Sequence, residues 1–158
     1  MRDDILLRDR ANTACLAAVP DVLETMFFEL LAEAPEMGSL APVDLLDSSR
    51  VDFEGSARGY LIVAAPSSLS ASLAEAFLAL EDQGAPESNI EFVLGELANM
   101  LCGSALGRFQ PEGTFRLSTP VTHHGRTLAE QSEPGFPWIR FPLDSGPLLV
   151  GLRLEASE

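Results

Sequence analysis

The chain has 158 residues, of which 46% are hydrophobic, and its formal net charge is −14. This length and apolar content are typical of one folded domain with its own core. Every basic residue is an arginine, and the excess of acidic side chains argues against binding to nucleic acid or to an anionic membrane surface.

The N-terminus begins with Met1-Arg-Asp-Asp and has no apolar signal region. No run of about eighteen apolar residues is evident, so we expect no membrane span. Two cysteines, Cys15 and Cys102, are too few for a disulfide framework. These features predict a cytoplasmic protein with a single domain over residues 1–158, in which residues 1–18 form either a helical or a frayed extension.

The first half of the chain predicts a helix, a hairpin and a second helix. Pro20 fits the first turn of a helix whose apolar stripe continues to Leu31 and which Pro35 and Gly38 end. Residues 35–49 read as a loop with one short edge strand. Two β-type runs, 50–54 and 58–65, flank Gly55-Ser-Ala and predict a hairpin. A helix over about 69–80 and a turn over 82–86 follow.

The longest helical pattern covers residues 88–109, and Gly107 is its expected end. One face of this helix is apolar and carries Ile90, Val93, Leu94, Leu97, Met100, Leu101 and Leu106. Three strands are then predicted over 114–120, 138–141 and 147–154, with a long, mobile loop over 128–137. The fold class is therefore α+β, an antiparallel sheet with long helices. Because a helix followed by strands occurs twice, the chain looks like a degenerate internal duplication.

Two polar residues interrupt the longest helix on one side. Glu96 and Asn99 are three residues apart, so their side chains point the same way, and Phe92 and Gly103 lie near the same line. Asn and Gly inside a helix are unfavourable by up to about 0.7 and 1 kcal/mol relative to Ala. Two interpretations remain open: a solvated face with small residues where another helix crosses, or a functional site.

Residues 95–105, GELANMLCGSA, resemble the signature of the CheX branch of the CheC/CheX/FliY chemotaxis phosphatases, which carry Glu-x-x-Asn on a long exposed helix. The resemblance continues upstream in residues 59–66, GYLIVAAP. It continues downstream in residues 117–125, LSTPVTHHG, where Pro120 stands close to the family's later proline. The resemblance implies a CheC-like fold.

It also implies an activity, the hydrolysis of the phospho-aspartate of a CheY-like receiver domain. Asn99 would position the attacking water, and Glu96 would contact the receiver's active site. Phe92 and Gly103 would contact the partner. The protein would need no cofactor of its own, because the receiver supplies Mg²⁺ and a lysine.

The chain departs from the family's fuller motif at one informative place. The fuller motif has Asp or Ser where this chain has Phe92, which is either an exposed aromatic anchor or part of the core. This departure favours an alternative function, a non-catalytic module that binds a receiver or another chemotaxis or flagellar-switch partner. In the first half, Glu24-Thr-Met-Phe27 stands where two-site relatives have a second Glu-x-x-Asn, and we interpret it as a packing segment.

Two further expectations concern metals and assembly. His123 and His124 are adjacent in a strand and point to opposite faces, so no metal site is predicted. The last strand carries more apolar residues than one buried face requires, and the resemblance includes homodimers. We therefore expect self-association through a sheet edge or the long loops.

Overall fold

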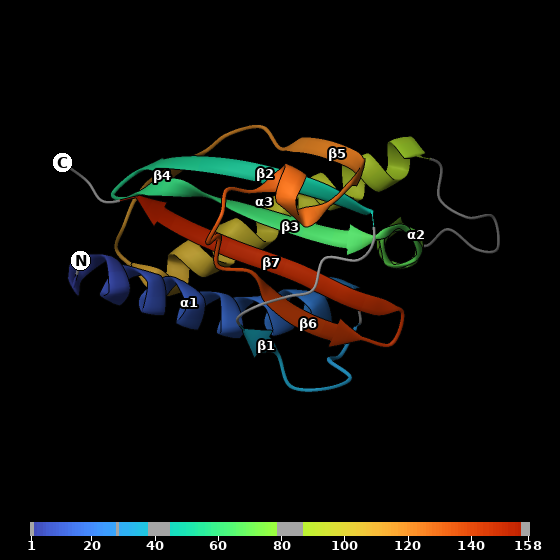
Figure 1. Ribbon diagram of the computed structural model, residues 1–158, viewed down its shortest axis with the longest axis horizontal. Coiled ribbons are helices and arrows are strands. Elements are labelled where there is room, and N and C mark those ends of the chain that lie inside the picture. Colours follow the sequence, from blue (N-terminus) through green and yellow to red (C-terminus); the bar gives the residue numbers. More distant parts are fainter. Residues whose placement is uncertain (1, 28, 38–44, 79–86, 156–158) are drawn as a thin grey trace.

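The computed structural model describes residues 2–27, 29–37, 45–78 and 87–155, and it shows one sheet backed by two long helices (Figure 1). These helices are α1 (Arg2–Phe27) and α3 (Glu87–Phe109), while α2 (Ser67–Leu78) lies at one end of the sheet. The strands are β1 (Glu36–Met37), β2 (Leu46–Gly55), β3 (Arg58–Pro66), β4 (Phe115–Leu117), β5 (Val121–Arg126), β6 (Ile139–Leu143) and β7 (Gly146–Glu155).

All pairings between the described strands are antiparallel, and the strand order is β1-β6-β7-β3-β2-β4, with β5 also paired to β2. This arrangement confirms the predicted α+β class. The predicted hairpin is also present, with Phe53 opposite Gly59 and Gly55 at a φ of 133° that favours glycine. Strand β2 begins at Leu46, four residues earlier than predicted, and the predicted turn over 82–86 lies outside the described residues.

Helix α1 corrects the prediction that a helix starts at Pro20. The helix is continuous from Arg2, so residues 2–18 are helical rather than frayed, and Pro20 lies in its interior. An interior proline removes one backbone hydrogen bond and costs about 3 kcal/mol. Val19, Leu23 and Phe27 are each at most 1% exposed. Burial of each such side chain contributes about 1.5–3 kcal/mol, which is enough to offset the proline.

Helix α3 matches its predicted start within one residue but continues past Gly107 to Phe109. A contact with α1 explains the longer end. Arg10 donates from Nη2 to the carbonyl oxygen of Phe109 at 3.0 Å, and its guanidinium stacks on the Phe109 ring. The last turn of α3 thus gains a hydrogen-bond donor for one of its free carbonyl groups. Because Arg10 is distant in the sequence, no local pattern predicts this contact.

By length and composition alone, Asn89–Phe109 is long and apolar enough to cross a membrane, in contrast to the expectation of no membrane span. Half of that segment is buried inside the protein. It contacts α1, α2 and several strands. This is the environment of a core helix in a folded domain.

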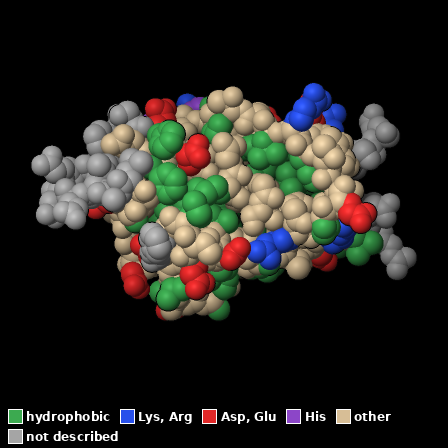
Figure 2. Space-filling model, turned by 180° about the vertical axis from the view of Figure 1, so that it is seen from behind, with side chains coloured by type: hydrophobic (Ala, Val, Ile, Leu, Met, Phe, Trp, Pro, Cys, Tyr) green, Lys and Arg blue, Asp and Glu red, His purple; other side chains and the backbone are tan. Residues whose placement is uncertain are grey.

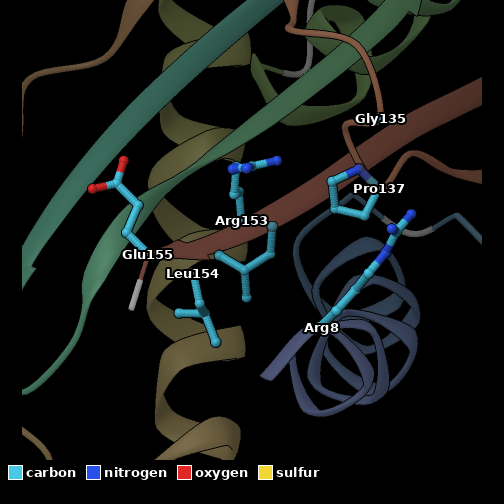
Figure 3. A pocket seen from close by; sticks show the side chains of 7 residues that line it. Arg8, Gly135, Pro137, Arg153, Leu154 and Glu155 are labelled. Atoms are coloured by element: carbon cyan, nitrogen blue, oxygen red, sulfur yellow. The ribbon is translucent and has the colours of Figure 1, made fainter. Parts of the chain in front are cut away.

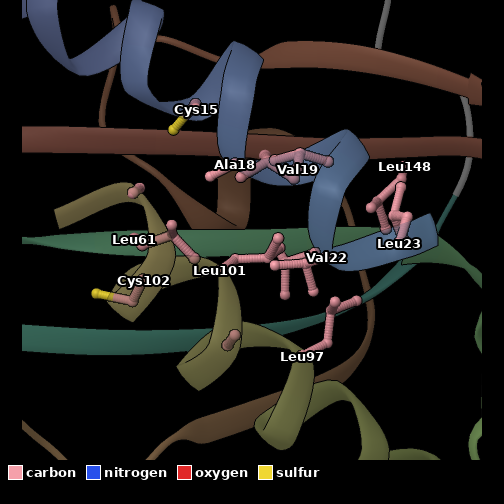
Figure 4. Packing of buried hydrophobic residues seen from close by; sticks show 14 of the residues in the cluster. Cys15, Ala18, Val19, Val22, Leu23, Leu61, Leu97, Leu101, Cys102 and Leu148 are labelled. Carbon is pink, nitrogen blue, oxygen red and sulfur yellow. The ribbon is translucent and has the colours of Figure 1, made fainter. Parts of the chain in front are cut away.

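The main core lies between the two long helices and the inner face of the sheet (Figure 4). Leu23 of α1 and Leu97 and Leu101 of α3 are fully buried there. Cys15 and Cys102 are also buried as free thiols, and burial raises the pKa of each to about 12. Both cysteines therefore serve as small apolar core residues at neutral pH.

A smaller core covers part of the outer face and corrects the prediction of a mobile loop over 128–137. Helix α4 (Leu128–Gln131) begins with a capping box between Thr127 and Glu130. The ring of Phe136 then stacks on Tyr60 at 5.5 Å, and Trp138 donates from Nε1 to Ser132. Burial of these aromatic rings holds residues 128–138 on the sheet. The Pro and Gly residues of the segment do not indicate this packing.

The two cores also account for the apolar surplus in β7. Leu148 and Val150 belong to the main core, whereas Leu149 belongs to the smaller one. Alternate residues of a strand point to opposite faces, so a strand covered on both sides is apolar throughout. The observation that motivated self-association thus has an explanation within a single chain.

Gly151→Ala tests how the outer segment is held. A Cβ at this position would overlap the ring of Phe136, so we expect the ring to be displaced and the free energy of unfolding to fall by about 1–3 kcal/mol. Trp138, the only tryptophan, packs edge-on against Phe136, and its fluorescence should change. Gly107→Ala, in α3, where a Cβ meets nothing within 4 Å, is the control; it should not lower the free energy of unfolding and should leave the fluorescence unchanged. Unchanged stability and fluorescence in Gly151→Ala would contradict this packing.

Candidate functional site

Glu96 and Asn99 lie on one side of α3, next to the segment that leads into β5, and both side chains are half-buried. They line one surface hollow of about 380 Å³, together with Glu91, Phe92, Gly95, Pro120 and Thr122. The prediction that both residues share an accessible face of the long helix is therefore confirmed. The opposite face of the helix fixes this orientation, because Leu94, Leu97 and Leu101 are each at most 1% exposed.

The carboxylate of Glu96 and the carboxamide of Asn99 have no hydrogen-bond or ion-pair partner within the described chain. Other polar groups of the long helices do have partners; Arg108, for example, pairs with Asp21 at 3.0 Å. A carboxamide offers two donors and an acceptor, and a carboxylate offers only acceptors. The pair is thus available to an incoming molecule at no cost in internal bonds.

Pro120 and Thr122 complete the hollow from the strand side, and neither was predicted as a site residue. A Cβ on Gly95 would lie 3.3 Å from Cβ of Pro120, so the bare glycine lets the β5 segment approach the helix. Thr122 donates from Oγ1 to Ser49 on β2 at 3.1 Å, which fixes β5 beside the helix. Two features of the sequence could have indicated this contact: Gly95, a glycine inside the helix, and Pro120, which stands close to the family's later proline.

Phe92 is 55% exposed, which excludes the interpretation that it belongs to the core. Gly103 is also exposed, and a Cβ placed on it would meet nothing within 4 Å. Phe92, Glu96, Asn99 and Gly103 therefore form one open stripe along α3.

Residues 24–27 of α1, which stand where two-site relatives have a second Glu-x-x-Asn, have no accessible pair of this kind. Phe27 is 1% exposed and stacks on Phe77 at a centroid distance of 5.1 Å, while Glu24 is exposed. This confirms the interpretation of residues 24–27 as a packing segment.

The lining of the hollow is acidic. It contains Glu91 and Glu96 but no Lys or Arg. Within the described residues, no three His, Cys, Asp or Glu side chains are grouped to hold a metal ion; His124 instead lies 3.2 Å from Asp47. The described part of the site therefore contains no cation that could neutralise a phosphoryl group.

A second hollow, of about 370 Å³, lies between α1 and the end of β7 (Figure 3). Arg8 extends from α1 toward Pro137, and the lining also includes Leu152 and Leu154. Arg153 at its side is paired with Glu133 at 3.3 Å. The described lining of this second hollow contains no carboxamide beside a carboxylate. The Glu96 and Asn99 pair predicted from the sequence therefore lies in the first hollow.

The fold and this site define a class of protein: an antiparallel sheet backed by long helices, one of which exposes a Glu-x-x-Asn pair. The family described as chemotaxis phosphatase CheX matches residues 48–143, more than half of the chain, and the chain belongs to that family.

Solved structures show the same fold. The chemotaxis protein CheX from Desulfovibrio desulfuricans is 22% identical, with a TM-score of 0.73 over 92% of this chain and 99% of that one. A CheX-CheY-BeF3-Mg²⁺ complex from Borrelia burgdorferi matches at 17% identity and TM-score 0.71, over 92% and 98% of the two chains. FliY from Thermotoga maritima matches at 11% identity and TM-score 0.62, over 96% and 89%. A comparison with curated proteins gave no match.

The two helical glycines of the site provide a matched test of its geometry. Gly103→Ala should raise the free energy of unfolding by up to about 1 kcal/mol, because alanine is the better helix former and the new Cβ meets nothing. Gly95→Ala should raise the free energy of unfolding by less, or lower it, because the new Cβ would press against Pro120. Urea denaturation of both variants makes the comparison. An equal gain in the two would show that the helix and the Pro120 segment are not in close contact.

Proposed function

We propose that this chain is a phosphatase that hydrolyses the phospho-aspartate of a CheY-like response-regulator receiver domain. The observation that carries the proposal is that Glu96 and Asn99 line one accessible hollow and have no hydrogen-bond or ion-pair partner among the described residues. Membership of the chemotaxis phosphatase family and the CheX-CheY complex of the Borrelia burgdorferi relative support the choice of substrate.

Asn99 is assigned the positioning of the attacking water. Phosphoryl transfer requires the attacking and leaving oxygens to lie roughly in line, and catalysis is mostly positioning and charge stabilisation. The carboxamide oxygen of Asn99 accepts a hydrogen bond from the water, while its NH₂ group donates to a neighbouring oxygen. Positioning of this kind lowers a barrier by several kcal/mol, about 7–11 kcal/mol in the best cases. No covalent intermediate on this chain is needed.

Glu96 is assigned the docking of the receiver. The charged side chains described in the hollow are all negative, so we expect positive charge near the phosphoryl group to come from the partner. We assign this charge to the receiver's Mg²⁺ and to its active-site lysine, which Glu96 would bind. Glu96 thus sets the position of the receiver, and Mg²⁺ is supplied with the substrate. Gly103 leaves room along the helix for the receiver's backbone to come close.

A second function is a receiver-binding module without catalysis. The observation in its favour is Phe92, which stands exposed at the motif position where the family has Asp or Ser. The intact and unobstructed Asn99 favours the phosphatase.

Separate substitutions distinguish the two roles. Asn99→Ala should lower the catalysed rate of dephosphorylation by roughly 100-fold while receiver binding is nearly unchanged, because only the water is misplaced. Glu96→Ala should weaken binding by about 10-fold as well as lower turnover, because an interfacial charge pair is lost. Added salt should reproduce part of the Glu96 defect and none of the Asn99 defect. The measurements are the decay of a phosphorylated receiver and a titration with the beryllofluoride-activated receiver.

Glu24→Ala is the matched control, since Glu24 is exposed at the equivalent place on α1 and lies outside the hollow. Full turnover in Asn99→Ala would rule out the water-positioning role. Binding without accelerated decay in the unmutated protein would establish the non-catalytic module instead.

We also propose that the chain forms homodimers through a sheet edge. Strand β5 pairs only with β2 among the described strands, so no described strand pairs with the backbone groups of its other edge, and a strand of a second chain could pair there. Light scattering at micromolar concentration should give a mass near twice the monomer mass of 17.0 kDa. A strict monomer would contradict the proposal.

A further inference from the structure

We infer that Phe92, with Glu91 and Glu96 beside it, determines which receiver this protein accepts: one that presents an apolar socket bordered by basic side chains. The inference rests on the proposed function and adds a specificity element to the same site. The fuller motif has Asp or Ser at this position, and this chain has an exposed aromatic side chain there.

The position of Phe92 makes it a contact that a docked receiver cannot avoid. Phe92 lies seven residues before Asn99 on the same face of α3, a separation of about 10 Å along the axis at 1.5 Å per residue. A specific interface covers about 800 Å² on each partner, a patch roughly 30 Å across, which is wider than this separation. A receiver whose phosphoryl group reaches Asn99 therefore also covers the Phe92 ring.

The surroundings of Phe92 define the chemistry of its partner. The ring is 55% exposed, and the lining of its hollow contains two carboxylates and no Lys or Arg. On the face formed by the two long helices, hydrophobic and acidic side chains lie together near the start of α3 (Figure 2). An apolar anchor between negative charges favours a partner with an apolar recess and positive charges at its edge.

This arrangement also rejects other receivers. A partner with a polar or acidic side chain opposite Phe92 would have to bury that group without a hydrogen bond, or place its charge near Glu91. The effect is on binding, because the ring has no group that takes part in proton or phosphoryl transfer. Phe92 is thus a specificity residue, distinct from Asn99, which acts on the water.

The test combines a binding titration with steady-state kinetics on the CheY-type receivers of the source organism. Each receiver is activated with beryllofluoride and Mg²⁺ for binding and phosphorylated for turnover. Phe92→Ala should raise both Kd and KM for the accepted receiver at least 10-fold, about 1.4 kcal/mol, while kcat changes less than twofold. Glu91→Gln should increase Kd by a smaller factor that disappears at high salt. Leu30→Ala, at a residue 67% exposed outside the hollow, is the control and should change neither constant.

Three results with Phe92→Ala would overturn the inference. The first is an unchanged Kd for the receiver, and the second is a loss of activity confined to kcat. The third is a change in the protein's oligomeric state with no effect on receiver binding. Binding can be measured without turnover. A receiver that is bound through Phe92 but not dephosphorylated would refute the phosphatase proposal and leave the specificity role standing. A receiver that is dephosphorylated equally well by Phe92→Ala would do the reverse.

Discussion

The structure depends on the packing of α1 and α3 against the inner face of the sheet. Leu97 and Leu101 of α3 are fully buried in this interface, as is Leu23 of α1. Each contributes about 1.5–3 kcal/mol by burial, which together far exceeds the cost of Asn99 in a helix interior. This packing fixes the rotation of α3 about its axis. The rotation in turn decides that the Glu96 and Asn99 side chains face outward and that no core residue competes for them.

The site is chemically incomplete within the described part of the chain. Its hollow is acidic and is formed by a helix on one side and by Pro120 and Thr122 on the other. Hydrolysis of an acyl phosphate requires positive charge near the phosphoryl oxygens and a positioned water. In our proposal the receiver supplies the charge and this chain supplies the position of the water. In this proposal, activity therefore depends on correct docking of the receiver. The exposed Phe92 beside Glu96 and Asn99 is important in the proposal for that reason.

The two long helices carry a Glu at similar places, but only α3 presents a site. On α1, Phe27 is buried and stacks on Phe77, so this helix contributes apolar surface to the core. On α3, the corresponding side chain is Asn99, whose amide would cost several kcal/mol to bury without partners. One helix therefore stabilises the fold at this position, and the other leaves a polar group accessible.

The sequence by itself determined the period and ends of most elements, because apolar spacing and turn residues act locally. It predicted the hairpin at Gly55, the long helix near residues 88–108 and the shared face of Glu96 and Asn99. Tertiary structure alone decided the rest. Pro20 lies inside a helix because burial of its neighbours outweighs one lost hydrogen bond, and α3 passes Gly107 because Arg10, distant in sequence, binds the carbonyl of Phe109. Phe92 is exposed and Pro120 joins the site for the same reason: the rotation of a helix and the approach of a strand result from the packing of the whole core, which no local pattern encodes.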